Sequence, residues 1–272
     1  MIAASRPADR RAARRRGPSR RGLLLAGAAA LAAGCSGPAQ RPGATAAPAG
    51  ASTTATAAAP PSPAAPPPPS TPPPPPPLPP GLAEPDLAAG VLQRQVPRGG
   101  GGRLLVVPGS SPAPPSARVR TLRVEVEADL ADAGLLDPVR FADFALGVLN
   151  DPRGWGAGGT TSFARTDGDA ELRLVLATPD TSAALCRPLR TMGTLSCRVG
   201  DAAVLTWYRW VEAIPDYGED RTGYRQYVVN HEVGHLLGHG HEPGPGAGRR
   251  APVMMQQTKG LGGALPNPWP NP

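Results

Sequence analysis

The sequence predicts an α+β domain, a mixed sheet with packed helices, in roughly the last 170 of the 272 residues. Three observations support this fold class. Residues 119–127 alternate between polar and apolar side chains, as a strand with one solvent-facing side does. Asp137 and Pro138 are the residue types of a helix N-cap and first turn. From about Thr222 the apolar spacing becomes helical again, which predicts a second helix late in the domain.

The other elements are predicted in chain order. The first strand is expected to bury Leu122, Val124 and Val126, while Glu125, Glu127 and their polar neighbours face solvent. The first helix is expected to end at the turn of residues 150–154, and further strands are predicted at residues 161–164, 171–177 and 202–210. On the last helix, the expected core residues are Tyr224, Tyr227, Val228, Val233 and Leu236 or Leu237.

Residues 1–35 have the features of an export signal. An arginine-rich start precedes the apolar run of residues 22–34, which is too short to cross a membrane. Residues 31–35 resemble a bacterial lipobox, which implies cleavage before Cys35 and lipidation of its sulfur. The sequence therefore predicts a cell-envelope lipoprotein at the outer face of the cytoplasmic membrane, with plain secretion as the alternative.

The positive charge of the chain comes from this signal. Residues 1–21 contain eight Arg and one Asp, a balance that equals the net charge of +7 of the whole chain. The remainder is formally neutral, so the composition predicts no nucleic-acid partner.

Residues 36–102 are predicted to form a disordered linker rich in Pro and Ala. Between Pro60 and Pro80, 15 of 21 residues are proline, which favours polyproline II. At about 3.1 Å per residue this run would reach roughly 65 Å. Behind a lipid anchor it is expected to act as a spacer for a folded domain at residues 103–272.

Two of the three cysteines lie inside this domain. Cys186 and Cys197 enclose a short segment with Pro188 and Gly193 as turn formers. In an exported protein, such a pair predicts one disulfide.

All four histidines lie in residues 231–241. On a helix, His231 and His235 point to the same side, and Glu232 is offset by about 100°. This spacing is typical of two zinc ligands and a general base. A third ligand requires the chain to turn, and Gly238 permits a turn at a helix end. Three histidines would leave the fourth zinc position open for water.

Two histidines compete for the third position. His239 follows His235 by four residues, so an unbroken helix would favour it, whereas a turn at Gly238 favours His241. Glu242 is the last acidic residue of the chain, so no carboxylate from farther downstream is available.

The motif and its surroundings resemble the metzincin class of zinc peptidases, and especially uncharacterised exported proteins of actinobacteria. The resemblance rests on residues 224–235, Gly238 with His241, residues 251–257 and residues 266–270. It implies a zincin-like mixed sheet, an active-site helix and His241 as the third ligand. It also implies a methionine turn beneath the metal, with Met254 as the turn residue and Met255 as the alternative.

These features predict a zinc-dependent endopeptidase of the cell envelope that acts on protein or peptide substrates. Zinc held by the histidines is expected to lower the pKa of its water to about 7, and Glu232 to accept the water's proton and pass it to the leaving amine. One alternative is a non-catalytic, zinc-containing envelope binding module, although an intact Glu232 argues against it. A zinc amidase acting on peptidoglycan is a weaker alternative.

Overall fold

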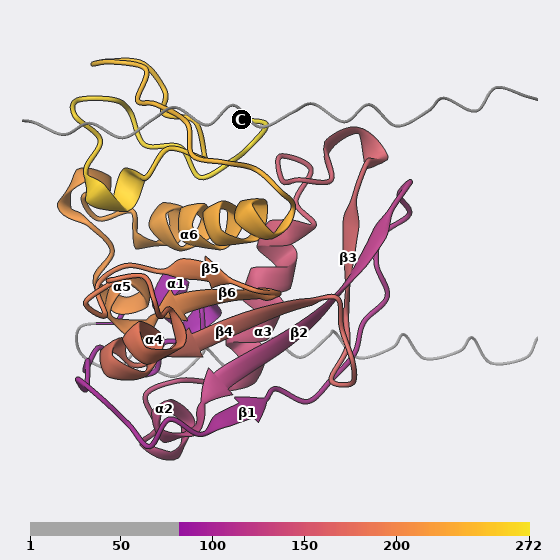
Figure 1. The fold of residues 1–272 in the computed structure, drawn as a ribbon, viewed down its shortest axis with the longest axis vertical. Coiled ribbons are helices and arrows are strands. Elements are labelled where there is room, and N and C mark those ends of the chain that lie inside the picture. Colours follow the sequence, from indigo (N-terminus) through magenta and orange to yellow (C-terminus); the bar gives the residue numbers. More distant parts are fainter. Residues whose placement is uncertain (1–81) are drawn as a thin grey trace, which may run out of the picture. The chain divides into compact units, whose positions relative to one another are not determined.

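The computed structural model describes residues 82–272, which form a six-stranded mixed sheet with several helices (Figure 1). This architecture confirms the α+β class. The strands are β1 (Leu104–Val106), β2 (Val119–Glu127), β3 (Ser162–Arg165), β4 (Leu172–Ala177), β5 (Cys197–Val199) and β6 (Ala202–Thr206). The helices are α1 (Glu84–Ala88), α2 (Ala128–Asp132), α3 (Pro138–Leu149), α4 (Pro179–Leu185), α5 (Trp207–Glu212) and α6 (Arg221–Leu236), with 3-10 turns η1 (Ala157–Gly159), η2 (Pro215–Tyr217) and η3 (Gln257–Lys259).

The sheet order is β1-β2-β4-β6-β5, and β3 shares with β1 the remaining edge of β2. Strands β2, β3, β4 and β6 are parallel, whereas β1 and β5 pair antiparallel with their neighbours. Strand β5 is therefore an antiparallel edge strand. In Figure 1, α6 lies beyond β5, and the C-terminal segment, in yellow, lies beyond α6.

The predicted signal peptide, Cys35 and most of the predicted linker lie outside the described residues. Within residues 82–272, no helix combines the length and apolar character that a membrane span requires.

The first predicted strand has the predicted bounds, but its polar side is not uniformly exposed. Glu125 and Glu127 are both buried. Glu125 pairs with Arg123 and Arg173, and Glu127 accepts hydrogen bonds from Thr178 N and Thr181 Oγ1. The prediction of a solvent-facing side was wrong for these two residues. Alternation shows which side of the strand a residue occupies but not whether another element covers that side.

The two predicted helices correspond to α3 and α6. Asp137 caps α3, and its carboxylate accepts from the Val139 and Arg140 amides. The strand predicted at residues 202–210 was too long, because Trp207 begins the helix α5. Trp207 and Trp210 then turn into the core beside α3 and α6, where Phe141 packs edge-on against Trp210.

The packed domain begins earlier than predicted. The linker was expected to reach residue 102, but residues 84–88 form α1, and Ala89 and Val91 are fully buried. In α1, Asp86 pairs at 2.6 Å with Arg225 of α6, and the two side chains are 1% and 0% exposed. Burial alone would raise the pKa of Asp86, but the hydrogen bond and charge of Arg225 outweigh it and lower that pKa.

Removing one partner of this buried pair is expected to destabilise the fold strongly. Asp86→Ala leaves the Arg225 guanidinium buried without its carboxylate, so the free energy of unfolding should fall by about 3–5 kcal/mol in urea titrations. The matched control is Asp132→Ala, which breaks the exposed pair with Arg103 and should cost less than about 1 kcal/mol. Equal losses in the two variants would contradict a structural role for the buried pair.

Candidate metal centre

Helix α6 ends in a way that reverses the chain directly after His235. Gly238 adopts a φ of 98°, a conformation that glycine accepts without steric cost. Its amide donates to the His235 carbonyl, and the His239 amide donates to the Gly234 carbonyl. These two bonds form a Schellman motif, which closes the helix and redirects the residues that follow.

The turn brings three histidine rings together. The Nε2 atoms of His235 and His241 are 3.0 Å apart, and one ring nitrogen from each of His231, His235 and His241 lies within 4.8 Å of the other two. This convergence fits three nitrogen ligands of one divalent cation.

Two of the rings are fixed by backbone carbonyls. His231 Nδ1 lies 2.8 Å from the Val253 carbonyl, and His235 Nδ1 lies 2.8 Å from the His239 carbonyl. A carbonyl only accepts, so in each ring Nδ1 carries the proton and Nε2 keeps its lone pair. This is the arrangement in which outer partners orient metal-binding histidines.

His239, the competing candidate, lies elsewhere. Its ring stacks on Trp155 with the centroids 4.3 Å apart, while its backbone carbonyl orients His235. Trp155 also donates its indole N–H to the Asn230 carbonyl at 2.9 Å, so it braces α6 beside the histidines. Trp155 was not predicted as a site residue, because no motif or spacing in the surrounding sequence marks it.

Glu232 and the three rings line the same cleft. The carboxyl group is almost fully buried, and burial raises its pKa to about 8. Burial also lowers the pKa of His231 to about 3 and lowers the pKa of His241. His231 and His241 are therefore neutral near pH 7, the state in which imidazole can bind a metal.

Met254 packs directly against α6. It is buried, and a Cβ placed on Gly234 would come within 2.6 Å of its sulfur and 2.5 Å of the Trp155 ring. Met255 instead packs against Ala251, Leu261 and Ala264. Of the two methionines, Met254 is therefore the one whose side chain packs against the helix that carries His231 and His235.

The segment around Met254 is held by buried polar side chains. Tyr227 donates to the Met255 carbonyl. Gln257, fully buried, accepts from Tyr217 and donates to the Pro252 and Asn267 carbonyls. Asn267 donates to the Ala251 carbonyl, so the C-terminal residues fix this segment against α6.

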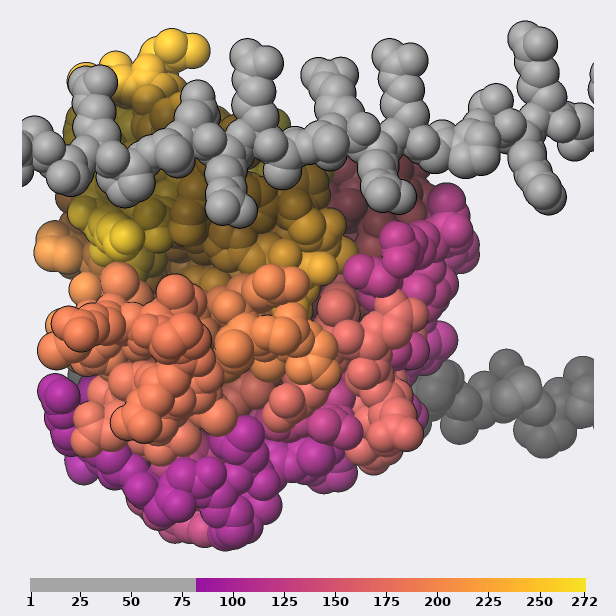
Figure 2. All heavy atoms as spheres, in the orientation of Figure 1, coloured from indigo at the N-terminus to yellow at the C-terminus, as the bar shows by residue number. Residues whose placement is uncertain are grey.

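The cleft that contains the histidines has a volume of about 550 Å³. Strand β5 and the loop of residues 187–196 form one side, and residues 238–241 with Gln256 and Lys259 form another. In Figure 2 the first group is orange and the second is yellow-orange to yellow.

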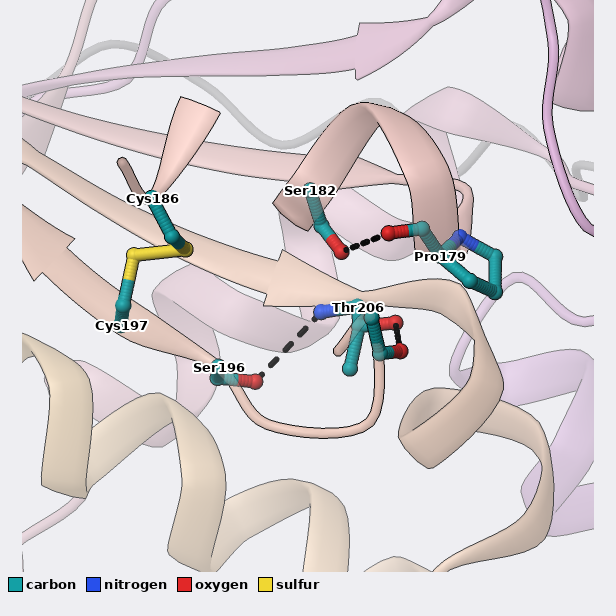
Figure 3. Close-up of a disulfide and its surroundings, with 7 residues drawn as sticks. Pro179, Ser182, Cys186, Ser196, Cys197 and Thr206 are labelled. Atoms are coloured by element: carbon teal, nitrogen blue, oxygen red, sulfur yellow. Dashed lines mark hydrogen bonds between the residues drawn. A yellow bond between two sulfur atoms is a disulfide. The ribbon is translucent and has the colours of Figure 1, made fainter. Parts of the chain in front are cut away.

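A disulfide closes the loop beside β5. Cys186 and Cys197 are bonded as predicted, which joins the end of α4 to the start of β5 (Figure 3). Two hydrogen bonds tie the loop to the end of β6, because Thr206 N donates to Ser196 Oγ and Thr206 Oγ1 donates to the Gly193 carbonyl. This side of the cleft is therefore held covalently and by hydrogen bonds.

The chain matches a known protein family. The family described as "Protein of unknown function (DUF3152)" matches residues 92–264, which include β1 to β6 and all the histidines. No curated protein and no solved structure shows significant similarity to the chain.

The buried carboxyl group predicts a pH-dependent stability of the metal-free protein. Glu232 holds its proton up to about pH 8 in the fold but releases it near 4.5 when unfolded, so the free energy of unfolding falls as pH rises between these values. The shift of His231 acts in the opposite direction, between about 3 and 6.5.

Between pH 6.5 and 8, the Glu232 effect is therefore unopposed by the histidine shifts. In the presence of a chelator, we expect the free energy of unfolding of the wild type to fall by up to about 2 kcal/mol across this pH range. In Glu232→Gln most of this fall should be absent. Urea titrations at several pH values measure it. The same slope in both proteins would show that Glu232 ionises freely.

The close contact at Gly234 predicts that even one added methyl group is harmful. Gly234→Ala forces Met254 and the rigid Trp155 ring to move, so unfolding free energy should fall by about 1–3 kcal/mol. Gly147→Ala in α3 is the control, because its Cβ meets nothing within 4 Å and alanine favours a helix. Thermal unfolding of the two variants measures the effect. Equal unfolding temperatures for Gly234→Ala and Gly147→Ala would contradict the close contact at Gly234.

Proposed function

The chain belongs to the DUF3152 family, and we propose that it is a zinc-dependent endopeptidase with a metzincin-type fold. One observation carries the proposal: three convergent histidine rings and a buried glutamate line a single open cleft. The helix with its terminal glycine turn, the third histidine beyond it and the buried Met254 below agree with that fold type.

The donor set fits zinc. His231, His235 and His241 would hold the ion through ring nitrogens, and two of these rings are already oriented by backbone carbonyls. When bound, zinc would supply an acidified water and a Lewis acid for the peptide carbonyl. Three protein ligands leave a coordination position open, which is typical of catalytic sites rather than structural ones.

Glu232 would act as the general base and then as the general acid. The positive charge of bound zinc would favour the ionised form of Glu232, and this carboxylate would accept the proton of the attacking water and deliver it to the amine that leaves. Its buried position favours the protonated form, so it would hold the transferred proton readily. Delivery to the amine would restore the carboxylate for another turnover.

An extended peptide fits the adjacent sheet edge. Strand β5 pairs only with β6 among the described strands, so its other edge can offer backbone hydrogen bonds. Peptides commonly bind by adding a strand to such an edge. Because β5 lines the metal cleft through Cys197 and Arg198, a peptide bound there would run past the histidines.

We also propose the envelope location. It rests on residues 1–35, with Cys35 as the lipidation site, and on the proline-rich spacer, all of them before residue 82. The alternative is a non-catalytic binding module at the same place, and the experiment below distinguishes the two.

The test is to replace the general base alone. Glu232→Ala in the full chain should retain zinc but reduce cleavage by about 10²–10⁴-fold, because the proton acceptor is lost. Zinc content is measured by metal analysis, and cleavage by new N-termini in a mixed envelope proteome, with and without chelator. His231→Ala should lose both zinc and cleavage.

Glu242→Ala is the matched control. This glutamate follows His241, is exposed and does not line the metal cleft, so its loss should leave cleavage unchanged. Undiminished cleavage by Glu232→Ala would refute the assigned base. A zinc-loaded wild type that generates no new termini would favour the binding module.

A further inference from the structure

The exposed charged side chains that line the metal cleft are all positive. Residues 82–272 contain 19 Lys and Arg against 20 Asp and Glu, so the described domain is nearly balanced. The cleft is not balanced, because its charged side chains are Arg190, Arg198, Lys259 and the buried Glu232. The excess of positive charge is therefore a property of this cleft and not of the domain.

The three cations come from separate segments. Arg198 belongs to β5, Arg190 to the disulfide-closed loop, and Lys259 to the end of η3. All three side chains are exposed. Two different parts of the cleft rim thus present positive charge toward whatever occupies the space between them.

None of the three cations is neutralised within residues 82–272. The ion pairs in this part of the chain involve other arginines, and Lys259 donates only to the neutral side chain of Gln256, at 3.1 Å. By contrast, Arg123 and Arg173 share the carboxylate of Glu125. The cleft cations are therefore free to pair with a ligand.

Unpaired cations in a concave surface attract anionic ligands, because the low-dielectric walls concentrate the field. Arginine adds geometry to charge, since its planar fork can bind a carboxylate through two hydrogen bonds. A peptide lying along β5 would place some of its side chains near Arg198 and Arg190 and others near Lys259. Glutamate or aspartate would be favoured at those positions.

We propose that the cleft selects acidic peptide segments and that Arg190, Arg198 and Lys259 determine this specificity. Cleavage of such segments rests on the proposed peptidase function, whereas selective binding does not. The substrate class is therefore a polypeptide with Asp or Glu side chains on both sides of the bound position.

The test measures binding separately from cleavage. The full-length Glu232→Gln protein, loaded with zinc, is titrated into three fluorescent extended peptides of one length that carry Glu, Gln or Lys at the flanking positions. The Glu peptide should bind about tenfold more tightly than the Gln peptide, and this advantage should shrink at high salt. The Lys peptide should bind most weakly.

Matched variants locate the effect. The cleft variant combines Arg190→Gln, Arg198→Gln and Lys259→Gln, and should reduce the preference for Glu over Gln to less than about twofold. The control variant removes three exposed arginines that do not line the cleft, through Arg103→Gln, Arg140→Gln and Arg187→Gln, and should keep the full preference. Zinc content and thermal unfolding verify that both variants fold.

Equal affinity for the Glu and Gln peptides, an equal loss in both triple variants, or no measurable binding of any peptide would overturn the proposal. Measuring cleavage of the same peptides by the protein with Glu232 intact tests the peptidase function separately from the acidic specificity. Selective binding of the Glu peptide without cleavage would refute the peptidase and retain the acidic specificity. Cleavage of all three peptides with equal binding would refute the acidic specificity and retain the peptidase.

Discussion

The site depends on where α6 ends. Two backbone hydrogen bonds, from the Gly238 and His239 amides, stop the helix directly after it has placed His231 and His235 on the same side. The same turn aims the His239 carbonyl at His235 and returns the chain so that His241 faces the other rings. A helix that continued would hold that carbonyl within its own hydrogen bonds and carry the third ring away. One residue with positive φ therefore controls both which rings converge and which nitrogen of the His235 ring carries the proton.

Local chemistry explains which features the sequence alone could predict. The cap at Asp137, the bounds of β2, the turn at Gly238 and the disulfide each depend on residues close together in the chain. The spacing of His231, Glu232 and His235 is likewise a property of one helical turn. The choice between His239 and His241 needed the resemblance as well, because both positions are compatible with histidine ligation until the path of the chain is known.

Contacts between distant segments explain what was missed. Trp155 and Asn230 are 75 residues apart, and Asp86 and Arg225 are 139 residues apart. No periodicity around Asp86 distinguishes its short helix from the Pro- and Gly-rich sequence on either side. Glu125 and Glu127 followed a correct alternation, but their burial depends on Arg173 and Thr178, which belong to other segments. The cations of the cleft also come from three separate segments, so their proximity is visible only in the fold.

The buried pair of Asp86 and Arg225 sets a limit on proteolytic trimming at the start of the domain. A cut before residue 82 would release a domain with α1 intact and with Arg225 still paired. A cut between Asp86 and β1 would leave the same guanidinium buried on the helix that carries the histidines, 0% exposed and without its carboxylate. Release of an intact domain and loss of the fold would thus differ by only a few residues in the position of the cut. The buried pair would decide which of the two outcomes a protease produces.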